Sequence, residues 1–407
     1  MRNVRILPIA HEKADLAANP FRPEVLEFCK PWHCLRFMDW LGTNNSINQR
    51  WSTRKRRTFY TQVGTDGDVL GFFGAPLPAW QRKWASGVAI ELCVQLANLT
   101  KTDAWLCVPH LADDEYILEM AKLVKAQLDP SLKVYVEFSN EMWNWMFGQA
   151  TWMLRSELAG DLVAAAGASP PWKGGVRPSA FRDGVVVEGA GEGIDHPERI
   201  GALFSRCFKI WEQVFSGADR KRLVRVCAVQ AAWLDTASRT LSWVTRNGGA
   251  DALAPAGYFG PNDEVYARWE AAGATLTADE VIADMRLMIA DSGKVVDAVY
   301  AGLAKEAGIR FITYEGGQHI QPRGQADTPY NPALTAAQTH PLMYDLYREN
   351  LDLYAQAGCD LFCAFASVSQ QGTRWGSWGH IETYGQDPAT APKYRAILEA
   401  NAPRASK

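Results

Sequence analysis

Eight short apolar runs, spread along the whole chain, constrain the fold more than any other feature of this sequence. They are Val4–Ile9, Cys34–Trp40, Ala104–Pro109, Val134–Phe138, Leu223–Val229, Leu253–Tyr258, Phe311–Tyr314 and Leu361–Ala366. Most runs are apolar at nearly every position rather than at alternate positions, which is typical of strands buried on both faces of a parallel sheet. Stretches with helical spacing separate most of them, and strands that alternate with helices pair in parallel through right-handed crossovers.

The helical stretches are predicted at Gly87–Asn98, Asp113–Gln127, Arg199–Val214, Thr236–Val244, Ala278–Ala307 and Pro341–Ala357. Eight strand–helix units predict an α/β fold, a closed (β/α)8 or TIM barrel. Decorated barrels can hold a whole chain of this length, residues 1–407, in a single domain. An open, doubly wound sheet is the alternative. That fold would place a Gly-rich phosphate-binding turn after an early strand, and the sequence contains none.

The spacing of the runs is uneven, because residues 139–222 separate the fourth run from the fifth. Gly and Pro are frequent in this interval, above all at 168–175 and 189–193. We therefore predict a large insertion, at about 146–205, in the fourth βα loop, with some helix of its own. A separate domain is the alternative, although no shift in composition marks its boundaries.

The charge balance limits the partners that this chain can have. Lys and Arg number 42 against 45 Asp and Glu, a net charge of -3, which predicts no surface for nucleic acid or for an anionic membrane. No run approaches the ~20 apolar residues of a membrane span. The first residues lack the apolar core of a signal peptide. We therefore expect a cytoplasmic protein, or a secreted or periplasmic one if a leader has been removed; the sequence predicts no oligomeric state.

The eight Cys do not form a recognisable site. Cys34, Cys107, Cys227 and Cys363 each lie in an apolar run, and no CxxC pair or Cys/His cluster occurs. Buried free thiols are expected rather than disulfides or metal ligands, because the spacing fits neither.

Two carboxylates stand at predicted strand ends. Asn140 and Glu141 follow the fourth run, and Glu315 follows the seventh. In a (β/α)8 barrel these ends meet at the mouth where active sites lie. Two carboxyl groups that flank a bond are the minimum for cleaving an acetal, because one protonates the leaving oxygen while the other attacks or activates water. The alternative is that each Glu caps a helix or pairs with an Arg.

The stretch 138–145, Phe-Ser-Asn-Glu-Met-Trp-Asn-Trp, and Tyr-Glu-Gly-Gly at 314–317 resemble the catalytic strand ends of clan A glycoside hydrolases. These are retaining (β/α)8 enzymes that include the family 5 cellulases and mannanases. The resemblance covers roughly residues 31–380 and reaches no single family, because Met142 stands where many family 5 members have Pro. It implies that Glu141 is the acid/base, that Glu315 is the nucleophile and that Asn140 binds the substrate 2-hydroxyl. Retaining enzymes hold the two carboxyl groups about 5 to 5.5 Å apart.

Further residues are predicted to line the same cleft. Arg36 is a charge inside an apolar strand and resembles the second-strand Arg that keeps the clan's nucleophile ionised; a pair with Asp39 is the alternative. Tyr258 ends the sixth run, where clan members often place a hydrogen-bond partner of the nucleophile; an ordinary Tyr at the barrel rim is the alternative. The remaining candidates, each with an ordinary structural role as its alternative, are His110 and Gln230 for sugar hydroxyls, Trp375 or Trp378 for the floor of the −1 subsite, and Trp143 for a further subsite.

Sixteen Trp favour a cleft that stacks sugar rings, with an aromatic-rich core as the alternative. We predict a retaining glycoside hydrolase that acts on a β-linked polysaccharide or oligosaccharide, like an endo-β-1,4-glucanase or a mannanase, without metal or organic cofactor. Two other functions stay open. One is a non-catalytic sugar-binding barrel. The other is a metal-dependent hydrolase that would use His110, Asp113, Glu141, Glu315 and His319.

Overall fold

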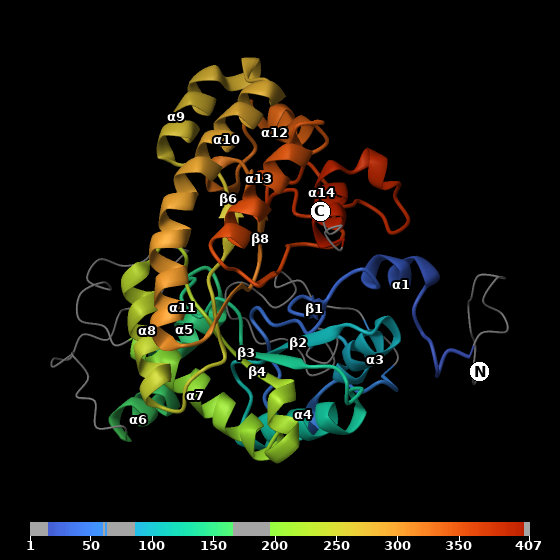
Figure 1. Cartoon of the computed structure of the whole chain (residues 1–407), viewed down its shortest axis with the longest axis vertical. Coiled ribbons are helices and arrows are strands. Elements are labelled where there is room, and N and C mark those ends of the chain that lie inside the picture. The colour runs from blue at the N-terminus through green and yellow to red at the C-terminus, as the bar shows by residue number, and fades with distance from the viewer. Residues whose placement is uncertain (1–14, 60–61, 63–85, 166–195, 403–407) are drawn as a thin grey trace.

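The computed structural model describes residues 15–59, 62, 86–165 and 196–402. Seven strands form one parallel sheet in the order β1-β2-β3-β4-β5-β7-β9, which is also the order of the chain (Figure 1). They are β1 Cys34–Arg36, β2 Asp103–Val108, β3 Val134–Phe138, β4 Leu223–Ala228, β5 Ala252–Ala254, β7 Arg310–Thr313 and β9 Leu361–Phe362. These strands match seven of the eight predicted runs, and the remaining run, Val4–Ile9, lies outside the described residues.

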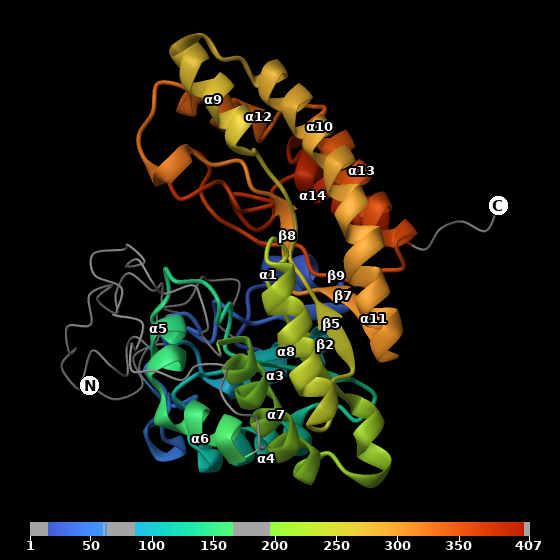
Figure 2. The ribbon, with the colours of Figure 1, turned by 90° about the vertical axis from the view of Figure 1, so that its left-hand side faces the viewer.

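Helices connect successive strands and pack against one another. α3 (Ile90–Thr100) contacts α4 (Asp114–Gln127), α4 contacts α7 (His196–Val214), and α7 contacts α8 (Leu234–Arg246). Figure 2 shows these four helices together in the lower half of the molecule. The start of α4 is fixed by Asp113, whose carboxylate accepts a hydrogen bond from a backbone amide of the first turn at 2.8 Å.

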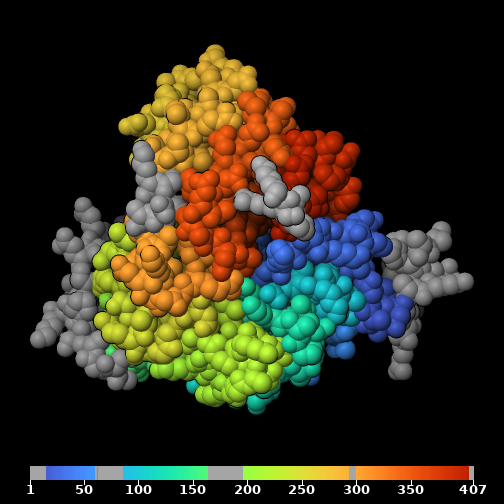
Figure 3. Space-filling view, viewed as in Figure 1, coloured from blue at the N-terminus to red at the C-terminus, as the bar shows by residue number. Residues whose placement is uncertain are grey.

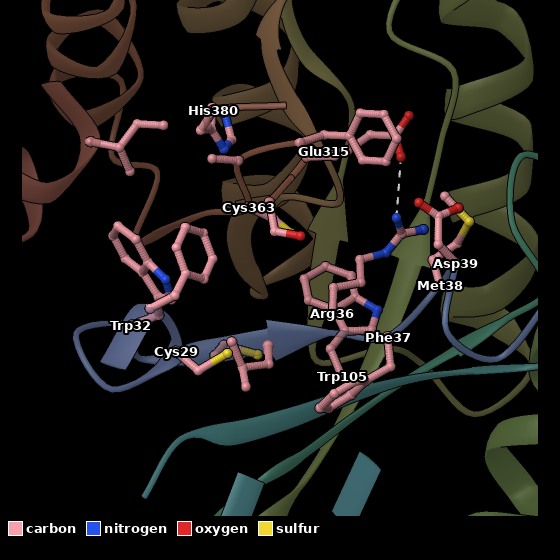
Figure 4. A pocket seen from close by; sticks show the side chains of 18 of the residues that line it. Cys29, Trp32, Arg36, Phe37, Met38, Asp39, Trp105, Glu315, Cys363 and His380 are labelled. Carbon is pink, nitrogen blue, oxygen red and sulfur yellow. Dashed lines mark hydrogen bonds and ion pairs between the residues drawn. The ribbon is translucent and has the colours of Figure 1, made fainter. Parts of the chain in front are cut away.

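β1 and β9 are the two edges of the sheet. The residues of β3 and β4 are buried throughout, whereas those of β1 and β9 are only half-buried. A cavity of about 360 Å³ is lined by residues of both edges, among them Cys34 of β1, and by Cys363 directly after β9. Figure 4 shows this cavity with Cys363 labelled. Within the described residues the sheet is therefore curled but open, and its closure into a barrel stays a prediction.

The prediction of one continuous sixth strand is wrong. The structure divides this run into β5 and β6 (Gly257–Phe259), because Pro255 lacks the N–H that would continue the ladder. β6 pairs in parallel with β8 (Gly316–Gln318) as a separate two-stranded sheet. Tyr258 therefore lies within β6, beyond the main sheet, and Glu315 lies at the break between β7 and β8.

A second hydrophobic cluster surrounds β6 and β8. It is built from the buried faces of α9 (Asp263–Ala272), α10 (Ala278–Val295), α12 (Asn331–Ala337), α13 (Met343–Gln356) and α14 (Pro392–Asn401). Figure 1 shows these helices as the yellow-to-red upper part of the molecule, above the labelled strands β1, β2, β3 and β4. In Figure 3 the same yellow-to-red colours cover the upper part of the surface. This cluster was not predicted from the sequence.

All six predicted helical stretches contain helix, and the longest of them continues from α10 through a π-helical segment, Val296–Ala301, into α11 (Gly302–Ala307). α5 Gly148–Arg155 and α6 Glu157–Ala165 lie within 146–205, where some helix was predicted. The helices that were not predicted are short: α1 Pro23–Cys29, α9, α12 and α14. One of them had a signal in the sequence. Asn262 caps α9 by accepting from the Val265 amide at 2.9 Å, and two acidic residues follow it.

Between β3 and β4 the described residues form α5, α6 and α7. Residues 166–195 lie outside the described ranges, so the insertion at 146–205 stays a prediction. No helix in the described part of the chain combines the length and apolar character of a membrane span. All eight Cys lie in the described ranges as free thiols; Cys107 and Cys227 are buried, and Cys34 and Cys363 are half-buried.

Candidate active site

Polar side chains from three strands meet at one end of the parallel sheet. Arg36 is the last residue of β1, Asn140 and Glu141 follow β3, and Glu315 follows β7. The strands run in the same direction, so these residues share the carboxyl edge of the sheet. A carboxylate that the sequence analysis left out, Glu137, lies within β3 and is 1% exposed.

The Arg36 guanidinium is the centre of this cluster. It donates to both oxygens of Glu137, from Nε at 3.0 Å and from Nη2 at 3.0 Å. Nη1 donates to Glu315 Oε2 at 3.1 Å (Figure 4), and Nη2 also donates to Asn140 Oδ1 at 2.8 Å. Arg36 thus pairs with Glu137 and Glu315 rather than with Asp39, and two carboxylates offset the burial of its charge.

Glu137 is held from the neighbouring strand as well. The Trp105 Nε1 donates to Glu137 Oε2 at 2.9 Å, and the Cys107 Sγ lies 3.5 Å from the same oxygen. The Trp105 ring also faces the Arg36 guanidinium, with 5.6 Å between Cζ and the ring centroid. These contacts fix both partners of the ion pair inside the sheet, and Arg36 is thereby aimed at Glu315.

A strained turn presents Glu141. Ser139 and Glu141 have positive φ angles of 62° and 41°, a conformation that costs about 1–3 kcal/mol for a residue with a Cβ. The Ser139 amide donates to the Val108 carbonyl of β2 at 2.7 Å, which holds the turn in place. The two Glu141 oxygens accept from the Tyr314 hydroxyl at 2.6 Å and from Asn144 Nδ2 at 2.7 Å.

Glu315 is 6% exposed and lies between groups of opposite charge. Burial raises the pKa of Glu315 well above its usual value, and the negative charge of Glu141 raises it further; Arg36 and a hydrogen bond from Tyr258 act in the opposite direction. Burial and the charges of Glu315 and Glu141 raise the pKa of Tyr258, so its hydroxyl stays a donor.

The protein engages the side chain of Asn140 at both ends. Its Oδ1 accepts from Arg36, and its Nδ2 donates to Asn44 Oδ1 at 3.0 Å. Gln149 Nε2 supports this arrangement by donating to the same Asn44 oxygen at 2.7 Å and to the Asn140 carbonyl at 2.9 Å. An amide nitrogen carries two hydrogens, so one Asn140 N–H remains for a ligand.

Aromatic rings gather beside Glu315. The centroid of the Trp378 ring lies 5.6 Å from that of Tyr258, 5.0 Å from that of His319 and 5.7 Å from that of Phe365. The Trp378 Nε1 donates to the Trp375 carbonyl at 2.9 Å, and the Trp375 ring is 43% exposed. Trp378 is thus in contact with a hydrogen-bond partner of Glu315, whereas Trp375 lies at the surface.

The other predicted residues have different surroundings. His110 packs against the Trp152 ring with 5.4 Å between centroids, and burial lowers the pKa of His110 to about 3. Gln230 Oε1 accepts from a backbone amide two residues away at 3.3 Å, within its own loop. Trp143 is buried with its ring against Tyr314, 5.9 Å between centroids. Among the described atoms, neither His110 Nδ1 nor Trp143 Nε1 has a hydrogen-bond partner.

Sequence reasoning missed two residues of the cluster: Glu137 and Tyr314. Glu137 had a signal, because it is a charged residue inside an otherwise apolar strand. Tyr314 had no such signal. Successive side chains of a strand point to opposite faces, so Tyr314 and Glu315 would lie on opposite faces if the strand continued. Because β7 ends at Thr313, both side chains can reach the same site.

The residues of the metal-hydrolase alternative are not brought together as ligands. Within the described ranges, no group of three His, Cys, Asp or Glu side chains is arranged to hold a metal ion. Asp113 caps α4, and His319 packs on Tyr258 and Trp378.

No family model and no curated protein matches this sequence. Among solved structures, it is similar to the GH51 arabinofuranosidase from Xanthomonas axonopodis pv. citri, with 11% identity, a TM-score of 0.44 and coverage of 86% of this chain and 61% of that one. It is also similar to a fungal β-1,4-galactanase, with 11% identity, a TM-score of 0.30 and coverage of 77% of this chain and 92% of that one. A third similar structure is the β-glycosidase from the hyperthermophile Thermosphaera aggregans, with 11% identity, a TM-score of 0.37 and coverage of 95% of this chain and 85% of that one. Likenesses of this size carry no argument, so a function has to be argued from the site itself.

Proposed function

We propose that this chain is a retaining glycoside hydrolase in which Glu315 is the nucleophile and Glu141 the acid/base. The observation that carries the proposal is a pair of carboxyl groups at one end of the sheet with unequal surroundings. Glu315 contacts the permanent cation Arg36, whereas Glu141 accepts hydrogen bonds from the neutral side chains of Tyr314 and Asn144. Such inequality lets one carboxylate attack while the other carboxyl group holds a proton.

The proposed first step needs Glu141 protonated and Glu315 ionised. Glu315 keeps hydrogen bonds from Arg36 and Tyr258, and both favour its ionised form. Once Glu141 is protonated, its negative charge no longer raises the pKa of Glu315. The Tyr314 hydroxyl can accept as well as donate, so its contact with Glu141 persists after protonation.

In the first step a Glu315 oxygen attacks the anomeric carbon, the bond to the leaving oxygen breaks, and that oxygen takes the Glu141 proton. In the second step Glu141 takes a proton from water, whose oxygen displaces Glu315 from the anomeric carbon. Two displacements retain the configuration, and we expect the carboxyl groups at the short separation of about 5 to 5.5 Å. The free Asn140 N–H would donate to the substrate 2-hydroxyl.

The proposed substrate is a β-linked polysaccharide or oligosaccharide, such as a β-1,4-glucan or mannan. Its support is the aromatic surface near Glu315, because flat rings pack on the C–H faces of pyranoses and Trp378 lies against Tyr258. The exposed Trp375 would extend this surface outward. His110, Gln230 and Trp143 are proposed as more distant parts of the cleft. The reaction needs neither a metal ion nor an organic cofactor.

The proposal includes a complete (β/α)8 barrel in one domain, with an insertion at 146–205. The described residues supply seven parallel strands, and the predicted run Val4–Ile9, which would supply the eighth, lies outside them.

A screen of β-linked polysaccharides, with products read by chromatography, tests the activity. On the substrate it identifies, Glu315→Gln should show no measurable turnover, because an amide cannot replace the nucleophile. Glu141→Gln should lose the natural glycan but still form the glycosyl-enzyme from activated aryl glycosides, whose leaving groups need no proton. Glu349→Gln, which changes an exposed carboxylate of α13 paired with Arg286, is the matched control and should retain full activity.

Rescue by azide is a second test of the roles proposed for Glu141 and Glu315. In Glu141→Ala, azide should restore turnover of the glycosyl-enzyme, because it attacks the anomeric carbon without a general base. Near-normal rates in both Gln variants would contradict the assignment. Saccharide binding without turnover, unaffected by either substitution, would favour the non-catalytic sugar-binding barrel.

A further inference from the structure

Lys393, on α14, is a buried cation that the proposed reaction does not use. Its side chain is 1% exposed, and Nζ donates to Gln338 Oε1 at 3.0 Å and to the Ser377 carbonyl at 2.8 Å. Both acceptors are neutral, so neither offsets the burial of an ammonium group as a carboxylate would. Burial lowers the pKa of Lys393 to about 7, and Glu382 acts in the opposite direction.

Two side chains donate to the Ser377 carbonyl, and a third residue contacts both of them. Lys393 comes from α14, and Gln318 of β8 donates to the same oxygen through Nε2 at 2.8 Å. Gln338, which follows α12, accepts from Lys393 and holds its own Nε2 3.5 Å from Gln318 Oε1. Gln318 lies three residues beyond Glu315, so this network ties the loop after β9 to the segment that carries the proposed nucleophile.

The position of Ser377 sets the position of Trp378. The Ser377 hydroxyl accepts from the Gly372 amide at 2.9 Å, which closes the turn 372–378. A Cβ on Gly376 would lie 2.7 Å from the Trp378 ring, so the ring packs tightly on its own turn. On its other side the ring contacts Tyr258, which hydrogen-bonds Glu315.

We propose that Lys393 is a positioning residue that clamps the turn 372–378 and thereby fixes Trp378 as one wall of the glycan site. The inference rests on the proposed function and names the residue that sets the affinity of that site for a sugar ring. An apolar side chain could fill the same buried position without a buried charge. It could not supply the two donors that reach Gln338 and Ser377.

Lys393→Met tests the clamp directly, because Met keeps a long, buried stem and lacks the donors. The Gly379 and His380 amides now donate to the Ser369 hydroxyl at 2.7 Å and to the Ala366 carbonyl at 2.9 Å. In the variant, hydrogen exchange followed by mass spectrometry should show them about tenfold less protected. Lys55→Met is the matched control, because Lys55 is a buried Lys (2% exposed) in another part of the chain; it should leave the 369–381 segment unchanged.

Steady-state kinetics of Lys393→Met are the second test of the clamp. On the glycan that the enzyme cleaves, Lys393→Met should raise KM about fivefold and leave kcat within about twofold, since a wall binds substrate and transition state alike. Unchanged exchange over 369–381 would overturn the clamp, even in an active glycosidase. Faster exchange in a protein that hydrolyses no glycan would uphold the clamp and contradict the proposed function. If Lys393→Met does not fold, Gln338→Met removes the side-chain acceptor of Lys393 and is judged by the same two measurements.

Discussion

Glu137 lies beneath the proposed substrate site, yet it decides where Arg36 points. Its two oxygens occupy Nε and Nη2, which leaves Nη1 for Glu315. Glu137→Gln keeps the shape of the side chain and removes its charge, so the guanidinium is free to turn. We expect turnover to fall about 10- to 100-fold, as it does when a supporting residue lets reacting groups shift. Steady-state kinetics on the natural glycan measure this change.

Glu91→Gln is the matched control for that experiment. Glu91 pairs with Arg54 at 2.7 Å, with side chains 16% and 10% exposed, in another part of the molecule. Both variants should lose unfolding free energy in urea, on the order of 3 kcal/mol or less, because each leaves a buried cation poorly paired. Only Glu137→Gln should lose turnover, and full activity in that variant would contradict the role given to Glu137.

Tyr314→Phe removes a 2.6 Å hydrogen bond to Glu141. The expected cost is about 1 kcal/mol of unfolding free energy and a loss of turnover that depends on the leaving group. Natural glycans need the Glu141 proton, so their kcat/KM should fall about tenfold. Activated aryl glycosides should change little. Equal losses on both kinds of substrate would show that Tyr314 does not act through Glu141.

At this scale the sequence was informative where a charge interrupted or ended an apolar run. Arg36, Glu141 and Glu315 stand out for that reason, and Glu137 could have been added by the same argument. Gln149 could not be found, because it reaches the site from a short helix whose position depends on long-range packing.

Among the elements, prediction failed mostly where a strand breaks. Pro255 marks the point between the end of β5 and the start of β6. The break was not predicted, because the residues on both sides of Pro255 are apolar and read as one strand. The break matters to the site, because it carries Tyr258 past the main sheet to Glu315. Continuous apolar character thus predicts that a strand exists more securely than it predicts where the strand ends.

The contact between α7 and α8 offers a test of element packing. A Cβ on Gly201 would lie 2.8 Å from the side chain of Trp243. Gly201→Ala should therefore lower the unfolding free energy by about 1–3 kcal/mol, because a tightly packed contact has to open. Urea unfolding measures this loss.

The control is Gly302→Ala, at the start of α11. No described heavy atom lies within 4 Å of the position that its Cβ would take. Alanine has the higher helix propensity, so this variant should gain up to about 1 kcal/mol. Destabilisation of similar size in both variants would contradict the close approach of α7 and α8.

For the whole molecule, the alternation of strands and helices correctly predicts a parallel sheet in chain order. It does not predict the second hydrophobic cluster, because periodicity shows that a helix has a buried face without showing what covers it. The helices α9, α10, α12, α13 and α14 pack on one another around β6 and β8, and α13 also reaches the main sheet, where Tyr354 contacts Phe311 and Phe362. Only the structure reveals this division.

His380 joins the loop after β9 to that helical part, with its ring 5.9 Å from the ring of Tyr347. Burial, and to a smaller extent the charge of Lys393, lowers the pKa of His380 from 6.5 to about 3. Between pH 6.5 and about pH 3, His380 is therefore protonated in the unfolded chain and neutral in the folded protein. The contribution of His380 to stability is complete above pH 6.5 and declines as the pH falls toward 3, by up to about 1.4 kcal/mol per unit.

His380→Leu should make the loss of stability between pH 6.5 and pH 4 shallower. Urea unfolding at several pH values measures the slope, and the difference from the unsubstituted protein isolates this residue from the other acidic and basic groups. His33→Leu, at an exposed position, is the control and should leave the slope unchanged. An unchanged slope in His380→Leu would contradict the burial of a neutral imidazole.

The central claim is that Glu315 forms a covalent bond to sugar while Glu141 delivers the proton. The most direct measurement is mass spectrometry of the protein after reaction with a 2-deoxy-2-fluoro glycoside that carries an activated leaving group and matches the substrate found by screening. We expect one fluoroglycosyl group per chain, located on the peptide that contains Glu315 and absent from Glu315→Gln. A label on another residue, or hydrolysis with inverted anomeric configuration and no label, would contradict it.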